Sequence, residues 1–312
     1  MKIVFFGTSN FSRLVAEKIL NSDHNIVAIV AQPDKVNGRN NKVTFNEMKV
    51  FALEHNIPIY QFAKLNLEGE EILKSLNADL FVTASYGQII KQNILDICPI
   101  INVHGSLLPK YRGPAPIQWC LINGETKTGV TIMRTELGLD CGEMYLKKEL
   151  EILPTDTCDT LFEKLGVLGG EAIVEFLDNY KDLICKGIKQ NEEEKSYFPM
   201  LTKEMSLLDF NQSSIKLVNL IRGLSTCNTA YFLYNNLRYK VLFASAVEGN
   251  GNAGIVLEAS AKKGLIIATS EGALRIETIQ PEGKKPMSAK DFCNSGKIKV
   301  GDFLNNWGKK YV

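Results

Sequence analysis

Lys2-Ile-Val-Phe-Phe-Gly7 places a compact apolar run directly before a glycine. Apolar residues then recur at helical spacing over residues 11–19, and Ser9 or Asn10 can cap the helix that this spacing predicts. A buried strand, a glycine turn and an amphipathic helix in this order are typical of the first unit of an open α/β sheet. The stretch therefore predicts the fold class of the N-terminal part of the chain.

The alternation of strand and helix patterns continues to about residue 188. Apolar runs predict the further strands Ile26–Ala31, Ala78–Ala84, Ile100–Val103 and Val130–Met133. Helical spacing predicts the helices Glu47–His55, Glu70–Leu76, Ile117–Ile122 and Thr157–Leu177. Strands that alternate with helices form mostly parallel sheets covered on both faces, so we expect residues 1–188 to form a Rossmann-like α/β domain.

The first turn does not fit a dinucleotide-binding enzyme. Gly7 supplies the first glycine of the G-x-G-x-x-G pattern, but the second and third positions hold Ser9 and Ser12. Side chains at those positions would keep a pyrophosphate away from the backbone. The sequence therefore argues against a nicotinamide-dependent enzyme.

The C-terminal part of the chain has a different pattern. A polar segment at 190–196 lacks apolar periodicity and predicts a linker over residues 189–205. A helical pattern that ends at Gly223 follows, and short apolar runs separated by turns then predict a small barrel or sandwich over residues 206–312. These runs are Ala230–Leu233, Tyr239–Phe243, Gly254–Leu257, Leu265–Ala268 and Leu274–Ile279.

Composition argues against membrane-spanning, disulfide-rich and metal-binding classes of protein. Of the 312 residues, 45% are hydrophobic, which is enough for two cores, and no run is long enough to cross a bilayer. The seven cysteines include no Cys-x-x-Cys pair and there are three histidines, so we expect neither a disulfide framework nor a metal site. The apolar part of the N-terminus is too short for a signal peptide, so we expect a cytoplasmic protein that contacts no membrane.

The net charge of +1 conceals a division of charge along the chain. Residues 201–312 hold 15 Lys and Arg against 9 Asp and Glu, which leaves 21 against 26 for residues 1–200. A basic C-terminal part indicates a polyanionic partner, although a solvated surface is the commoner cause of so modest an imbalance.

A polar pair marks the end of the strand predicted at 100–103. Residues two apart on a strand point to the same face, so Asn102 and His104 would project together, next to the turn that starts at Gly105. Ligands of open α/β sheets bind at the carboxyl ends of strands. An amide that stabilises an oxyanion beside an imidazole that moves a proton suits acyl transfer. For these two residues alone, a satisfied polar pair in the core is the alternative interpretation.

The motifs around Asn102 and His104 favour the catalytic interpretation over the satisfied polar pair. Asn102-Val-His-Gly-Ser-Leu-Leu-Pro109 is followed by Lys110-Tyr-Arg-Gly-Pro-Ala-Pro-Ile-Gln-Trp119, and Gly138-Leu-Asp-Cys-Gly142 lies further along the chain. Together these motifs resemble the folate-dependent formyltransferases, and the resemblance covers nearly the whole chain. It implies an enzyme that transfers the formyl group of 10-formyltetrahydrofolate to an amine by direct acyl transfer.

The resemblance also implies roles for individual residues. Asn102 would donate a hydrogen bond to the oxyanion, and His104 would assist it and transfer protons. Asp140 would orient or charge the imidazole, directly or through water, whereas alone between glycines it would be an ordinary turn residue. The folate pocket would be formed by Ser106, Leu107, Leu108 and Pro109 on one side and by Tyr86, Gly87 and Gln88 on the other.

Two basic segments indicate which amine is formylated. Residues 31–42 resemble the loop with which family members that act on initiator methionyl-tRNA engage the acceptor stem, and Arg39 and Lys42 would contact the tRNA there. A segment near the C-terminus resembles the closing motif of the family, in which Lys284 and Lys285 would contact phosphates. The resemblance thus implies methionyl-initiator tRNA as the substrate, a role in translation initiation, and an oligonucleotide-binding-like barrel in the C-terminal part.

Departures from the family and rival functions qualify these expectations. Leu224–Thr229 replaces the usual Asn-Pro-Trp-Pro turn, Cys141 stands where threonine is common, and the loop after Arg39 has fewer lysines and prolines. Enzymes that formylate glycinamide ribonucleotide or a nucleotide-linked amino sugar, or that hydrolyse formyl-tetrahydrofolate, could keep the same three polar residues. A non-catalytic RNA-binding protein on this scaffold would be expected to have lost one of them. We expect the chain to act as a monomer.

Overall fold

The computed structural model describes residues 1–37, 42–224 and 228–305. Arg39 and the unusual Ser225-Thr226-Cys227 segment lie outside the described residues. Contacts divide the chain into two compact units. The first unit contains Met1–Ile117, Thr126–Leu153 and Thr160–Pro199, and the second contains Gln118–Glu125, Pro154–Asp159 and the residues from Met200 onward.

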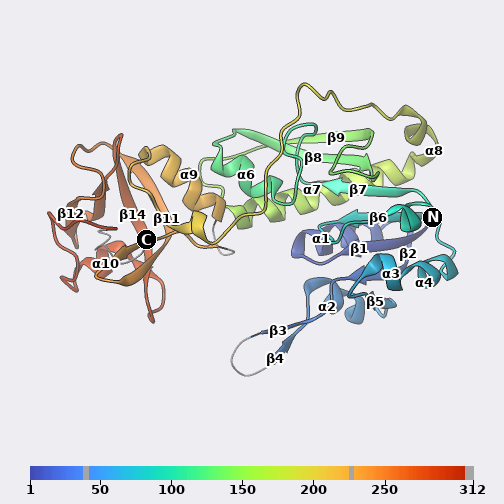
Figure 1. The fold of residues 1–312 in the computed structure, drawn as a ribbon, viewed down its shortest axis with the longest axis horizontal. Helices are drawn as coiled ribbons and strands as arrows, with labels where there is room; N and C mark the ends of the chain where they lie inside the picture. Colours follow the sequence, from blue (N-terminus) through green and yellow to red (C-terminus); the bar gives the residue numbers. More distant parts are fainter. Residues whose placement is uncertain (38–41, 225–227, 306–312) are drawn as a thin grey trace. The chain divides into compact units, whose positions relative to one another are not determined.

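A seven-stranded sheet forms the centre of the first unit (Figure 1). The strand order is β5-β2-β1-β6-β7-β8-β9. The first five strands are parallel to one another, β8 pairs antiparallel with β7, and β9 pairs antiparallel with β8. This confirms the predicted mostly parallel, Rossmann-like sheet. The strands are β1 (Lys2–Gly7), β2 (Asn25–Ala31), β5 (Ile59–Gln61), β6 (Leu80–Ala84), β7 (Ile100–His104), β8 (Lys127–Arg134) and β9 (Met144–Glu151), and β3 (Lys35–Asn37) pairs separately with β4 (Lys42–Thr44).

Helices cover both faces of this sheet. On one face Val4 and Phe6 pack against Leu65 and Leu73 from the short helices that precede β6. On the other face a Cβ on Gly169 would lie 2.9 Å from Val103, so this glycine lets the long helix α7 approach the sheet. The helices of this part are α1 (Asn10–Leu20), α2 (Glu47–Glu54), α3 (Leu65–Glu68), α4 (Glu70–Ser75), α5 (Gln92–Leu95), α6 (Pro116–Ile122), α7 (Cys158–Asp178) and α8 (Tyr180–Leu183).

The first turn of the sheet is closed by a buried serine. Ser12 is fully buried, and its Oγ accepts hydrogen bonds from the backbone N–H groups of Thr8 (3.0 Å) and Ser9 (3.3 Å). The same hydroxyl donates to the carbonyl of Ala84 (2.5 Å). The backbone donors that a dinucleotide phosphate would use are therefore already engaged, which explains in physical terms why this turn does not suit such a cofactor.

An antiparallel curled sheet makes up most of the second unit. Its order is β10-β11-β14-β13-β12, and β15 pairs with β14. Residues 301–305 bond to both edges, because Val256 donates to the carbonyl of Asp302 and Asn305 donates to the carbonyl of Leu233. This confirms the predicted small barrel and shows that a C-terminal segment joins its edges. The elements are α9 (Ser214–Leu224), β10 (Tyr231–Tyr234), β11 (Leu237–Val247), β12 (Val256–Ser260), β13 (Gly264–Ala268), β14 (Ala273–Pro281), β15 (Met287–Ser288) and α10 (Ala289–Cys293).

Neither unit contains a helix, within the described ranges, whose length and hydropathy would let it cross a membrane.

Candidate active site

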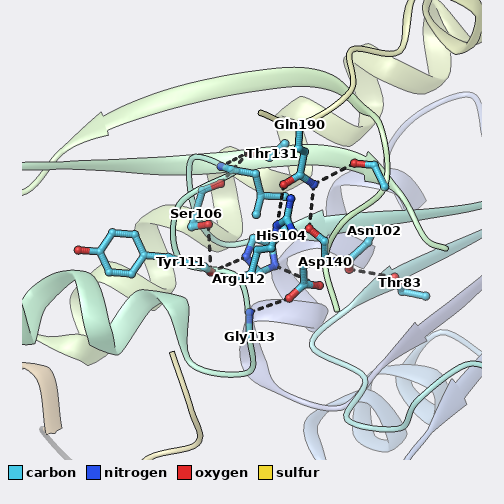
Figure 2. A network of polar contacts seen from close by, with 12 residues as sticks. Thr83, Asn102, His104, Ser106, Tyr111, Arg112, Gly113, Thr131, Asp140 and Gln190 are labelled. Carbon is cyan, nitrogen blue, oxygen red and sulfur yellow. Dashed lines mark hydrogen bonds and ion pairs between the residues drawn. The ribbon is translucent and has the colours of Figure 1, made fainter. Parts of the chain in front are cut away.

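The carboxyl ends of β6 and β7 bring Asn102 next to Thr83, its partner in the parallel register (Figure 2). Thr83 Oγ1 donates a hydrogen bond of 2.9 Å to Asn102 Oδ1. Because the amide oxygen accepts this bond, the Nδ2 end of the amide is directed away from Thr83. Asn102 is half-buried, so its Nδ2 donor is placed at the rim of the sheet, where a developing oxyanion could be bound.

His104 follows on the same strand and is 5% exposed. Its Nε2 lies 3.0 Å from the carbonyl oxygen of Tyr111. A carbonyl only accepts hydrogen bonds, so Nε2 carries a proton and Nδ1 is the ring atom whose protonation can change. Nδ1 lies 3.8 Å from Asp140 Oδ1, which is too long for a direct hydrogen bond but close enough for an ion pair with a charged imidazole.

Asp140 sits on a strained turn between β8 and β9. Its φ is 47°, in the left-handed region that Asp tolerates better than most residues. The backbone N–H of Gly113 donates to Asp140 Oδ2 (2.8 Å), so one carboxylate oxygen is fixed and the other faces His104. A Cβ on Gly142 would lie only 2.0 Å from the carbonyl oxygen of Arg134, so this turn requires the glycine that follows Cys141. The structure thus brings Asn102, His104 and Asp140 to one edge of the sheet.

The segment Ser106–Pro109 forms a firm wall directly after β7. Ser106 and Leu108 are 1% exposed. Ser106 Oγ donates to the carbonyl of Lys110 (2.8 Å), while Thr131 Oγ1 donates to the carbonyl of Ser106 (2.7 Å) and accepts from the N–H of Leu108 (3.1 Å). The hydroxyl and the carbonyl of Ser106 and the N–H of Leu108 are therefore occupied within the protein. Leu107 is half-buried and offers apolar side-chain surface.

The segment 86–88 contributes differently from what its side chains suggested. The Tyr86 ring is 5% exposed and packs edge-on against Phe6 in the core, with ring centroids 5.3 Å apart, and this burial raises the pKa of its phenol. The Gln88 amide donates to the carbonyl of Phe62 (2.9 Å) and accepts from the N–H of Leu65 (3.0 Å). Any ligand at this edge would therefore meet mainly the backbone of the segment, including Gly87, which is exposed and has a φ of 88°.

The predicted tRNA contacts lie in other parts of the structure. Lys284 and Lys285 are exposed in the turn between β14 and β15. Lys42 begins β4, whereas Arg39 lies outside the described residues. Sequence reasoning missed two further cations of the second unit, which line a hollow together with residues 280–283: Arg238 and Lys240 of β11.

Sequence reasoning also missed the groups that hold the site together. Thr83 is one polar residue in an apolar strand, and only the strand register shows that it faces Asn102. Arg112 is 1% exposed, and Gln190 of the predicted linker is 8% exposed (Figure 2). Arg112 lies in the Lys110–Trp119 motif that carries the resemblance, so that motif was its signal, whereas nothing in the polar stretch around Gln190 marks this glutamine as buried.

Comparisons with known proteins span both units. The family model described as formyl transferase matches residues 1–177, and the one described as formyl transferase, C-terminal domain, matches residues 200–297. A methionyl-tRNA formyltransferase from Streptococcus uberis is 41% identical over 97% of this chain and 99% of its own length. Another, from Streptococcus thermophilus, is 42% identical over 96% of this chain and 98% of its own length.

A solved structure shares the fold. It is that of WlaRD, a sugar 3N-formyl transferase, in the presence of dTDP and 5-N-formyl-THF. Its TM-score with this chain is 0.64 at 22% identity, and the match covers 91% of this chain and 99% of WlaRD.

Proposed function

This chain belongs to the formyl transferase family of enzymes, and we propose that it transfers the formyl group of 10-formyltetrahydrofolate to the α-amine of methionyl-initiator tRNA. The transfer is a direct acyl transfer that supports translation initiation in the cytoplasm, and the chain acts as a monomer. The observation that carries the proposal is the convergence of Asn102, His104 and Asp140 at one sheet edge in a chain so similar to full-length methionyl-tRNA formyltransferases.

Each of the three residues has a task in this reaction. The neutral amine attacks the formyl carbon, a C–N bond forms, and the carbonyl oxygen becomes an oxyanion that Asn102 Nδ2 stabilises. The bond between the formyl carbon and N10 of the folate then breaks, as the attacking nitrogen loses a proton and N10 gains one. His104 Nδ1 relays that proton, and Asp140 stabilises the charged imidazole in the meantime.

The folate would bind where the ends of β6 and β7 lie side by side. The turn 106–109 supplies an apolar wall through Leu107. The facing polar groups would come from the backbone of the exposed Gly87, because the carbonyl of Tyr86 already accepts from Thr8 Oγ1 and Gln32 Nε2. Apolar walls with a few placed polar groups are what a pteridine ring requires. The residues of these two segments are therefore proposed as the folate site.

The tRNA would be held by cations of both units. Arg39 and Lys42 belong to the loop that would engage the acceptor stem, and Lys284 and Lys285 would contact phosphates of the backbone. We assign catalysis to residues 1–188, linkage to 189–205 and tRNA binding to the barrel of 206–312, where Arg238 and Lys240 join the proposed phosphate contacts.

A formyl-transfer assay with several amines in parallel tests this function. The purified chain receives 10-formyltetrahydrofolate together with charged initiator tRNA, glycinamide ribonucleotide or a nucleotide-linked amino sugar, and a fourth reaction contains no acceptor. We expect rapid formylation of the charged tRNA alone. Preference for another amine, or release of formate without an acceptor, would replace the proposed substrate with that alternative.

A further inference from the structure

The segment Gln190–Phe198, here called the strap, is bound along the residues that support the active site. The carbonyl of Ser196 accepts a hydrogen bond from the N–H of Arg112 (2.9 Å), and the hydroxyl of Ser196 accepts one from the N–H of Tyr111 (2.9 Å). The N–H of Phe198 donates to the carbonyl of Arg112 (3.0 Å), and the rings of Phe198 and Tyr111 stack with centroids 4.8 Å apart. This part of the predicted linker is therefore bound to the first unit, with one isolated parallel bridge between Arg112 and Tyr197.

The residues under the strap also hold the two catalytic side chains. The carbonyl of Tyr111 accepts from His104 Nε2, and the N–H of Gly113 donates to Asp140 Oδ2. Tyr111 has a φ of 61°, which an aromatic residue adopts only when its surroundings impose it. The strap supplies that constraint, because its bonds to Tyr111 and Arg112 fix the peptide on each side of the strained residue.

The strap has two sets of contacts: the first is the backbone and ring contacts of residues 196–198, and the second is the side chain of Gln190, which binds the turn that carries Asp140 directly. Gln190 Nε2 donates to the carbonyl of Asp140 (2.8 Å) and to the carbonyl of Gly142 (2.9 Å), while its Oε1 accepts from Arg112 Nε (2.9 Å) (Figure 2). Both hydrogens and the oxygen of this buried amide are thus used. The amide closes the turn on which Asp140 faces His104.

Arg112 connects these two sets of contacts. Its guanidinium is 1% exposed, and such a group is tolerated inside a protein only when its donors are bound. Its partners all belong to the strap: Gln190 Oε1, Glu192 Oε1 (2.7 Å) and Tyr197 Oη (3.0 Å). The burial of Arg112 and the docking of the strap therefore depend on each other.

We propose that Gln190 and Arg112 are positioning residues for formyl transfer, which hold the Asp140 turn and the carbonyl of Tyr111 in the geometry that His104 needs. This inference rests on the proposed function, in which His104 and Asp140 act on the substrate. Neither positioning residue touches the reacting atoms. Their effect passes through the turn and the strained backbone, so it falls on turnover and leaves substrate affinity nearly unchanged.

Gln190→Glu keeps the contact of this side chain with Arg112 and removes its two contacts with the Asp140 turn. The carboxylate keeps an acceptor for Arg112, but it cannot donate to the carbonyls of Asp140 and Gly142 and repels them instead. We expect kcat to fall about 10- to 100-fold, because small misplacements of catalytic groups cost that much, while KM for the folate and for charged tRNA stays within about twofold.

Asn179→Asp is the matched control. It makes the same change from amide to carboxylate and removes the hydrogen bond that Asn179 Nδ2 donates to the carbonyl of Glu175. Asn179 directly follows α7, and this helix carries no proposed site residue. We expect it to shift the thermal midpoint at most, with kcat and both KM values unchanged. A kcat loss as large in this control as in Gln190→Glu would show that the kcat effect is not specific to the strap and would overturn the proposal.

Gln190→Met serves if Gln190→Glu does not fold, because it removes the two donors without adding a charge. A folded variant of either kind with kcat within about twofold of the parent overturns the proposal, since a lost positioning contact costs more than that. So does failure of both to fold, which assigns Gln190 to stability. His104→Ala, assayed in parallel, tests the proposed function separately: if it keeps full activity, that function fails regardless of the strap.

Discussion

Asn102 provides the sharpest prediction at the scale of single residues. Asn102→Ala should lower kcat about 10²- to 10³-fold, the usual loss for one oxyanion donor.

Thr83→Val keeps the volume but removes the hydroxyl that orients the Asn102 amide, so kcat should fall about tenfold with little change in KM. Turnover at saturating substrates checks both. A Thr83 variant with parental kcat would mean that the amide needs no such orientation.

His104 and Asp140 should act as a unit with Asn102. Each single change to alanine should severely impair turnover, but pairing either with Asn102→Ala should cost less than the product of the single losses, because groups that serve one transition state are not additive. A double-mutant cycle on kcat/KM measures this coupling. Strict additivity would separate Asn102 from His104 and Asp140, whose ring nitrogen and carboxylate face each other at 3.8 Å.

Local sequence was enough to propose Asn102 and His104 as a pair, and the family resemblance added Asp140, whereas the groups that support them could not be foreseen. Asn102 and His104 lie two apart on one strand, so their common direction follows from strand geometry. Thr83 meets Asn102 through a register between two strands, and Gln190 meets Asp140 across a long loop. Contacts of this kind depend on tertiary packing, which composition and periodicity do not encode.

The same contrast holds at the scale of elements. The central strands were predictable because both faces are buried and their sequences are continuously apolar. The edge strands β5 and β9 were not predicted, since β5 has three residues and the centre of β9 is the charged run Lys147-Lys-Glu149 rather than an apolar run. The docking of the strap was not predicted, because a polar composition does not show that Gln190 and Glu192 bind the buried Arg112 rather than water.

A pH experiment tests how firmly the strap is docked. Hydrogen bonds from Arg112 and then from Lys195 lower the pKa of Glu192 from 4.5 to about 2. A carboxyl whose pKa is lower in the folded state stabilises that state above the unfolded pKa, and the contribution is lost as pH falls through the folded value. The stability advantage of the parent over Glu192→Gln should therefore be constant above pH 4.5 and disappear as the pH falls toward about 2.

Denaturant unfolding of both proteins across this range measures the difference. The Glu192 side chain is 59% exposed, so added salt should reduce the advantage at neutral pH. A gap between the two proteins that does not change with pH would mean that Glu192 does not carry its charge into the pair with Arg112.

At the scale of the whole molecule, the division of charge matches the proposed division of labour. The first 200 residues carry the proposed acyl-transfer groups and a net negative charge, while residues 201–312 carry the excess of cations. A tRNA is held through its phosphates, which Lys and Arg side chains attract. Binding of charged tRNA should therefore weaken steeply with salt, and binding of a folate analogue should not.

Arg39→Ala and the double variant Lys284→Ala, Lys285→Ala separate tRNA binding from chemistry. Arg39→Ala should lower kcat/KM for charged tRNA while the dissociation constant of a folate analogue is nearly unchanged, because a guanidinium can grip phosphate with two bonds or stack on a base. The double lysine variant should act in the same direction but more mildly, since exposed lysines only position the backbone and each should reduce the salt slope by about one unit. Equal losses of tRNA and folate affinity in Arg39→Ala would mean that this arginine supports the fold, and unchanged tRNA kinetics would remove the loop from recognition.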